Sequence, residues 1–167
     1  MPVNVQQILI SVVSLKSFSH KNEVKNLKGW ILYKGSELDL KPEAYEINRL
    51  LDVAEKNNIE VKVVRPEQFE LIVTRDDRKS VLLDGKTVSL PDFLLPRMGA
   101  ETSYFALAII RHLERLGVHT FNSSHSIETV KDKLYSQQIL AEADISFPKT
   151  MLAKHPIDVN LVEEQFG

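Results

Sequence analysis

The 167-residue sequence contains no cysteine. This absence excludes a disulfide framework, a thiolate zinc site, an iron–sulfur cluster and a cysteine nucleophile. Histidine occurs five times, but no two histidines have the i, i+4 spacing that places metal ligands on one face of a helix. We therefore expect no metal site in this chain. Because nothing indicates an oxidising compartment, we also expect a cytoplasmic location.

Glycine is also scarce, with six residues in the whole chain. No two of these glycines have the spacing of a dinucleotide-binding fingerprint or of a Walker-type phosphate loop. The serines at positions 14, 17, 80 and 103 lack the glycine-flanked turn in which serine hydrolases hold their nucleophile. The sequence therefore argues against both kinds of phosphate loop and against a serine hydrolase.

A large excess of one charge and a long apolar run are lacking as well. The formal net charge is -2, which gives no electrostatic reason to expect nucleic acid or an anionic membrane as a partner. The apolar stretch Ile8–Leu15 follows no basic segment and is too short to span a bilayer. We expect a short strand there, with an accessory helix or a stretch outside the core as alternatives. From the small net charge, we expect a small molecule or a protein as the partner of the chain.

What the sequence does contain is an alternation of strand and helix patterns over the length of one compact domain. Apolar residues make up 43% of the chain, which is enough for a substantial core. The order strand, helix, strand predicts right-handed parallel crossovers, and so a three-layer α/β fold with a mainly parallel, Rossmann-like sheet. The expected core strands are 29–33, 59–64, 92–95 and 118–121, and the expected helices are 40–57 and 102–116, with His112 at the flank of the second helix.

Between the second and third core strands, the sequence predicts an added hairpin. Residues 66–70 are expected to form a turn or a one-turn helix, and residues 71–74 and 81–83 are β-prone. Asp84-Gly85 is a favourable two-residue hairpin turn. This hairpin is expected to decorate the main sheet.

The last part of the chain is expected to begin a new subdomain. One helix is predicted from about residue 124 to residue 143, because apolar residues recur at helical spacing and a serine can cap its start. Ile145–Pro148 cannot continue that helix, residues 149–153 are β-prone, and 158–166 are predicted to be helical. The expected organisation is an extension at 1–27, an α/β domain at 28–124 and a further region at 125–167.

Three polar turns are expected at one edge of the sheet. Ser36 follows the first core strand, Arg97 the third and Asn122 the fourth. Because the carboxyl ends of parallel strands meet at one edge, where open α/β sheets bind ligands, we expect a site for an anionic substrate there. The alternatives are a surface or salt-bridged Arg97 and an Asn122 that satisfies its own turn.

On the helix expected after Asn122, two lysines are candidates for ligand binding. Lys131 and Lys133 are two positions apart, roughly 200° around a helix axis, so they cannot serve the same site. Lys133 shares a helix face with Gln137, which brings a cation and an amide together. The alternative is that both side chains are solvated.

Four stretches together resemble one known family. They are the sequence LLPRMG at Leu94–Gly99, the Asn122 turn, VKDKLYSQQIL at Val130–Leu140 and ISFPKT at Ile145–Thr150. In order and spacing, over roughly residues 28–152, the chain resembles the amino-terminal part of the RimK-type ATP-grasp ligases. The resemblance implies a pre-ATP-grasp domain followed by the beginning of an ATP-grasp domain.

The resemblance also implies an activity and site roles. These ligases use ATP and magnesium to activate a carboxylate as an acyl phosphate, which an amine then attacks, as when glutamate is added to a peptide or protein. By this resemblance Lys133 is expected to bind the ATP phosphates. Arg97, Asn122 and Ser36 are then expected to bind substrate.

The sequence also departs from the family. The family's magnesium ligands, second nucleotide lysine, adenine-binding hinge and phosphate-covering loop have no counterpart in these 167 residues. Residues 1–27, in turn, have no counterpart in the family. We therefore expect a part of a ligase that is not active alone and has the missing ATP-grasp domain as its partner, in cis or in trans. A homo-oligomer is the alternative partner. The alternatives are a non-catalytic binding or assembly module derived from this family, and a free-standing doubly wound domain of the response-regulator kind, which would need clustered acids at the strand ends.

Overall fold

The computed structural model describes residues 27–35, 42–73, 80–99 and 102–167. The strand expected at Ile8–Leu15 lies outside these residues. The chain divides into two compact units, Met1–Ser124 and His125–Gly167. Among the described residues, no helix has the length and apolar character needed to cross a membrane.

The first unit is built on a four-stranded parallel sheet with the strand order β2-β1-β6-β7. The strands are β1 (Lys28–Leu32), β2 (Glu60–Val64), β6 (Phe93–Pro96) and β7 (His119–Thr120). Leu32 pairs with Val64 on one side and with Pro96 on the other, and Leu94 pairs with Thr120. All three strand pairs are parallel, which confirms the expected parallel sheet.

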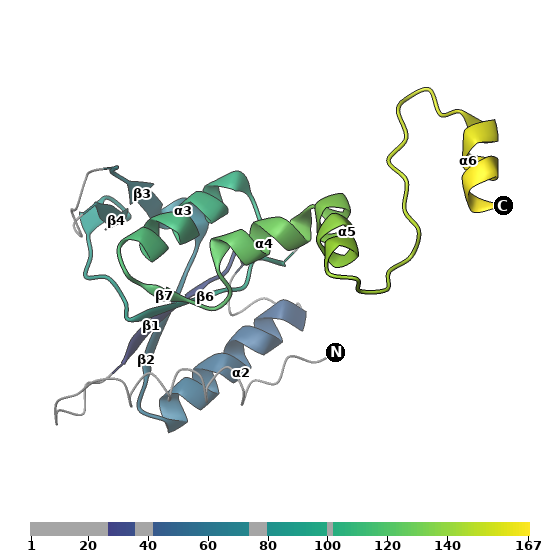
Figure 1. Ribbon diagram of the computed structural model, residues 1–167. Coiled ribbons are helices and arrows are strands. Elements are labelled where there is room, and N and C mark those ends of the chain that lie inside the picture. The colour runs from purple at the N-terminus through teal and green to yellow at the C-terminus, as the bar shows by residue number, and fades with distance from the viewer. Residues whose placement is uncertain (1–26, 36–41, 74–79, 100–101) are drawn as a thin grey trace. The chain divides into compact units, whose positions relative to one another are not determined.

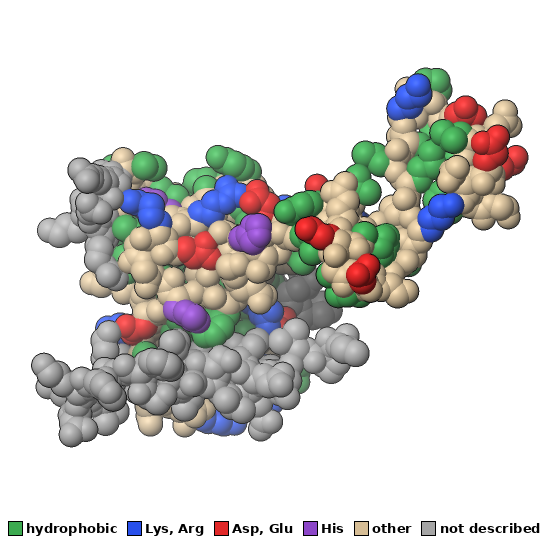
Figure 2. Space-filling view, viewed as in Figure 1, with side chains coloured by type: hydrophobic (Ala, Val, Ile, Leu, Met, Phe, Trp, Pro, Cys, Tyr) green, Lys and Arg blue, Asp and Glu red, His purple; other side chains and the backbone are tan. Residues whose placement is uncertain are grey.

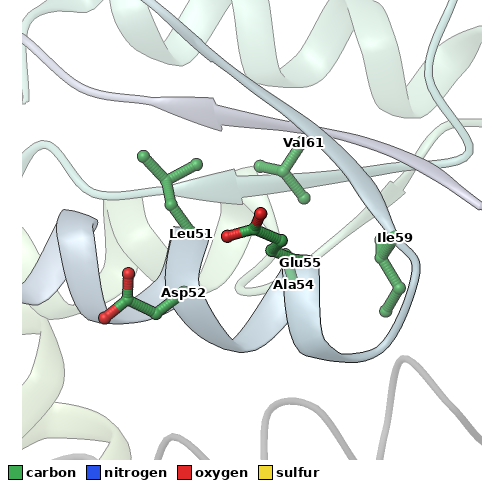
Figure 3. Close-up of a pocket in the computed structure, with 6 residues that line it drawn as sticks. All are labelled: Leu51, Asp52, Ala54, Glu55, Ile59 and Val61. Atoms are coloured by element: carbon green, nitrogen blue, oxygen red, sulfur yellow. The ribbon is translucent and has the colours of Figure 1, made fainter.

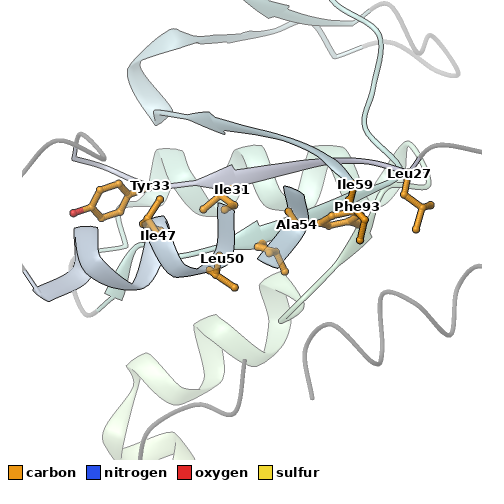
Figure 4. Packing of buried hydrophobic residues seen from close by; sticks show 9 residues of the cluster. Leu27, Ile31, Tyr33, Ile47, Leu50, Ala54, Ile59 and Phe93 are labelled. Atoms are coloured by element: carbon orange, nitrogen blue, oxygen red, sulfur yellow. The ribbon is translucent and has the colours of Figure 1, made fainter. Parts of the chain in front are cut away.

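Helices cover both faces of this sheet, as Figure 1 shows, and the three-layer prediction is confirmed. Helix α2 (Pro42–Lys56) packs its buried Ile47, Leu50 and Ala54 against Ile31, Tyr33, Phe93 and Leu95 in one core cluster (Figure 4). Alternate strand residues, Trp30, Leu32 and Leu94, are buried as well. Since successive side chains of a strand point to opposite faces, these residues belong to the face that helix α3 (Tyr104–Arg115) covers.

A second, three-stranded antiparallel sheet is added to the first unit. The one-turn helix η1 (Pro66–Gln68) leads into β3 (Phe69–Leu71), which pairs with β4 (Val81–Leu83), and β4 pairs with β5 (Lys86–Thr87). Asp84 and Gly85 form the hairpin turn, both with positive φ, as the sequence predicts.

Contacts at Phe69 and Ser80 help to attach this small sheet to the main fold. The rings of Trp30 and Phe69 meet edge to face at 5.8 Å, and the Ser80 hydroxyl shares a hydrogen bond of 2.8 Å with Nε2 of His112 on α3. The expectation that His112 lies at the flank of its helix is wrong, because its ring is buried. Ser80 gives one of the two ring nitrogens, Nε2, a hydrogen-bond partner inside the fold.

The expected single helix from 124 to 143 is wrong, because the structure has two helices there. Helix α4 (Ser124–Lys131) ends before Asp132, which is in an extended conformation, and α5 (Lys133–Glu142) follows. The Asp132 carboxylate accepts a hydrogen bond from the backbone N–H of Tyr135 at 2.9 Å and so caps α5. Aspartate favours this capping position over a helix interior, which is the physical reason for the break.

The β-prone stretch at 149–153 is not a strand, since residues 145–157 contain no regular secondary structure. Residues 125–167 contain no strand with which this stretch could pair. An unpaired strand would leave its backbone N–H and C=O groups without partners. Helix α6 (Val159–Phe166) then closes the chain, with Asp158 as its cap. From His125 onwards none of the side chains is fully buried.

Candidate functional site

Arg97 lies at the carboxyl end of β6, where its backbone N–H donates to the carbonyl of Leu32 at 2.8 Å. Its guanidinium donates from Nη2 to Oε1 of Glu46 on α2 at 2.5 Å. The two side chains are 20% and 38% exposed, so the ion pair lies at the surface of the fold without being fully solvated. The sequence-based alternative of a salt-bridged arginine therefore describes this structure, with one terminal nitrogen of the guanidinium engaged.

Asn122 follows the neighbouring strand, and its side chain is exposed. The Phe121 N–H donates to the Leu94 carbonyl at 3.0 Å, which continues the β6–β7 pairing by one residue. β7 ends at Thr120, two residues before Asn122, and β6 ends at Pro96, the residue before Arg97. The structure thus places Arg97 and Asn122 at the carboxyl ends of adjacent parallel strands.

Sequence reasoning missed the residue that holds the Asn122 turn. Glu114, in the last turn of α3, accepts hydrogen bonds from the Thr120 hydroxyl at 2.7 Å, the Ser124 backbone N–H at 2.8 Å and the Ser124 hydroxyl at 2.5 Å. Burial raises the pKa of Glu114, but the bonds from Ser124 and Thr120 and the charge of Arg111 outweigh it and hold the pKa below its usual range. No local sequence pattern marks this carboxylate, because its partners lie six and ten residues along the chain.

Lys133 lies in the second unit, as the first residue of α5, and its side chain is exposed. Because α4 ends at Lys131, the expected angle between Lys131 and Lys133 on a single helix does not apply. Gln137 remains one turn from Lys133, and its amide oxygen is buried without a hydrogen-bond partner. A common cleft for Lys133, Arg97 and Asn122 stays a prediction, and Ser36 lies outside the described residues.

A cavity of about 300 Å³ lies in the first unit, but at the other end of the sheet (Figure 3). Leu51, Asp52, Ala54 and Glu55 of α2, with Ile59 and Val61 at the start of β2, form its walls. β2 is parallel to β6, so the start of β2 and the carboxyl end of β6 lie at opposite edges of the sheet. The cavity is therefore not part of the Arg97 site.

The described residues differ in how well they suit magnesium and ATP. No group of three or more His, Asp or Glu in this part of the chain could hold a metal ion. The exposed ammonium of Lys133, in contrast, suits a phosphate as a point charge. Figure 2 shows acidic and basic side chains interspersed on the visible face, without a broad patch of one sign.

Comparison with known proteins matches residues 33–127 to the RimK PreATP-grasp domain. A probable alpha-L-glutamate ligase 1 of Shewanella amazonensis is 29% identical over 75% of this chain and 42% of its own. A probable alpha-L-glutamate ligase of Rhodopirellula baltica is 33% identical over 78% of this chain and 32% of its own. One of Legionella pneumophila is 34% identical over 70% of this chain and 39% of its own.

The matched region contains the whole parallel sheet beyond β1, both covering helices, Arg97, Asn122 and Glu114. The chain spans between 32% and 42% of the length of these curated relatives. The family match covers more than half of the chain and agrees with the three-layer parallel fold. The chain therefore belongs to the RimK pre-ATP-grasp domain family.

Proposed function

We propose that this chain is the amino-terminal, substrate-binding part of an ATP-dependent carboxylate–amine ligase in the cytoplasm. The observation that carries the proposal is the placement of Arg97 and Asn122 at adjacent strand ends, inside the region that matches the family. The relatives are named glutamate ligases, so we take glutamate as the amino acid that is joined to a peptide or protein. Nucleic acid and membrane are not among the proposed partners.

The proposed roles follow from the chemistry of each side chain. Arg97 binds and orients a substrate carboxylate through the N–H groups that Glu46 leaves open. The Asn122 amide, at the neighbouring strand end, donates or accepts one further hydrogen bond to the same substrate. ATP with magnesium supplies the phosphoryl group that activates the carboxylate, and the magnesium ligands come from an ATP-grasp domain outside the described residues. Lys133 attracts the phosphates as a compact positive charge.

Exposed apolar side chains in the second unit support the need for a further domain. Among them are Val130, Tyr135, Ile139, Leu161 and Phe166, each at least 38% exposed. Exposed apolar groups on the helices of a unit in which no residue is fully buried gain stability when another surface covers them. We propose that an ATP-grasp domain, in cis or in trans, supplies that surface.

The test of the nucleotide role is calorimetric titration with ATP and magnesium. We expect Lys133→Ala to weaken binding by about tenfold, because one charge-assisted contact to phosphate is lost. Lys131→Ala is the matched control, since Lys131 is also exposed but ends α4. Equal affinity of the two variants would contradict the role of Lys133. Absence of binding by the wild-type chain would remove nucleotide binding from these residues.

A second candidate is a non-catalytic assembly module, favoured by the same exposed apolar side chains. A second copy of the chain would then cover them. Light scattering separates the two functions, because a dimer supports the module. A well-behaved monomer that binds ATP supports the ligase part.

A further inference from the structure

The ion pair between Arg97 and Glu46 is anchored on both sides. Glu46 lies on α2 next to Ile47, which is fully buried in the core cluster, so the helix is held against the sheet at this point. The backbone of Arg97 is held by its hydrogen bond to Leu32. The carboxylate and the guanidinium therefore meet in a geometry that the core imposes.

The contact occupies only a part of the guanidinium. Glu46 accepts from Nη2 alone, whereas a guanidinium carries five N–H donors on three nitrogens. The Arg97 side chain is 20% exposed, so a ligand from solvent can reach it. A second anion on the remaining nitrogens would lie close to the Glu46 carboxylate and be repelled by it.

We propose that Glu46 makes Arg97 selective for a singly charged carboxylate over a doubly charged phosphate. Repulsion between Glu46 and a bound anion grows in proportion to the anion's charge, so a dianion suffers it twice. The pair formed by Arg97 and Glu46 has no net charge. A bound carboxylate adds one unpaired negative charge to it, whereas a bound phosphate dianion adds two. Glu46 is a specificity-determining residue in this scheme.

The inference rests on the role proposed for Arg97 and restricts the anions that Arg97 binds to carboxylates. Arg97 receives the carboxyl group of the amino acid or peptide, and the nucleotide phosphates are left to other cations. Glu46 also fixes one terminal nitrogen of the guanidinium, since it is the side-chain partner of Arg97 among the residues that the structure describes.

The experiment is an NMR titration that follows the Arg97 side-chain Nε–H resonance with two probes, acetate and inorganic phosphate in its dianionic form. Wild type, Glu46→Gln and Glu46→Ala are compared, and Arg97→Gln identifies the resonance. Glu55→Gln, an exposed position on the same helix, is the control for a change in overall charge. Thermal unfolding of each variant verifies that the fold is kept.

We expect both Glu46 variants to bind phosphate more tightly than wild type does. The gain in phosphate affinity should exceed the gain in acetate affinity by about fivefold, because one further unit of repulsion is removed. Glu55→Gln should leave the ratio of the two affinities unchanged. A parallel loss for both anions in the Glu46 variants would show a merely structural role and overturn the inference. An unchanged ratio would overturn it as well.

These outcomes are independent of the ligase assignment. A wild-type chain that binds ATP through Lys133 but shows no anion effect at Arg97 would overturn the inference and leave the nucleotide role standing. A shifted ratio in a chain that binds no ATP would support the inference and remove the nucleotide role proposed for Lys133.

Discussion

The Glu114 carboxylate accepts a hydrogen bond of 2.5 Å from the hydroxyl of Ser124, the first residue of α4. The same carboxylate accepts from the Ser124 backbone N–H and from the Thr120 hydroxyl. One side chain of α3 therefore closes the turn that connects β7 to α4. Asn122 lies inside this turn, so its backbone position depends on Glu114.

Glu114→Ala should destabilise the protein by about 1–3 kcal/mol, because it leaves the part-buried donors of Thr120 and Ser124 without an acceptor. Glu114→Gln should cost less, since its amide oxygen still accepts one bond. Urea denaturation measures both changes. Arg115→Ala is the control, because Arg115 is exposed in the same helical turn. Equal midpoints for Glu114→Ala and the control would contradict the bracing role of Glu114.

Stability should fall on mild acidification because of His112. Burial lowers the pKa of His112, and the positive charge of Arg115 lowers it further, from the ordinary 6.5. Below about pH 6.5 the unfolded chain takes up a proton that the folded chain does not, so stability decreases as the pH falls from there to the folded-state pKa. The pKa of Glu114 is lowered from the ordinary 4.5, so the stability that this carboxylate contributes is lost only at more acidic pH.

The measurement for His112 is the urea midpoint at about pH 7.5 and about pH 5.5, on either side of the ordinary histidine pKa. His112→Gln can keep a hydrogen bond to Ser80 but does not titrate in this range. We expect this variant to be less stable at the higher pH and to lose less stability between the two values than wild type does. An identical drop in both proteins would assign the pH dependence to another group.

Gly29→Ala tests the packing of β1 against β6. A Cβ atom at position 29 would come within 2.1 Å of the Phe93 ring, which is 2% exposed in the core cluster. The ring has little room to move, and overpacking of this kind costs about 1–3 kcal/mol. Thermal unfolding should show a lower midpoint. Recovery in the double variant with Phe93→Leu would attribute the loss to that ring, and no recovery would attribute it to another cause.

Asp132→Ala tests the boundary between α4 and α5. Loss of the cap on the Tyr135 N–H should cost about 1 kcal/mol of helix stability and lower the helical content measured by circular dichroism. Asp132→Asn should keep most of the signal, because its amide oxygen can accept the same bond. An unchanged spectrum for the alanine variant would show that the cap does not hold the first turn of α5.

The amino-acid sequence alone determined the order of the strands and helices in the first unit. Apolar periodicity is a local property, and it correctly indicated the four parallel strands, both covering helices and the hairpin at Asp84-Gly85. The strand-then-turn pattern also placed Arg97 and Asn122 at strand ends, because any residue that directly follows a parallel strand lies at that edge. Asp132 shows the limit of periodicity, since a capping preference at one residue ended a helix that the apolar pattern continued.

Only the tertiary structure decided which charged and polar side chains meet. Glu46 is 51 residues from Arg97, and Ser80 is 32 residues from His112. Packing of α2 and α3 on opposite faces of the sheet brings these partners together, and no pattern within a single element encodes such a meeting. The local sequence thus decided where the chain turns, and the packing of distant elements decided which groups at those turns are paired, buried or left open to a ligand.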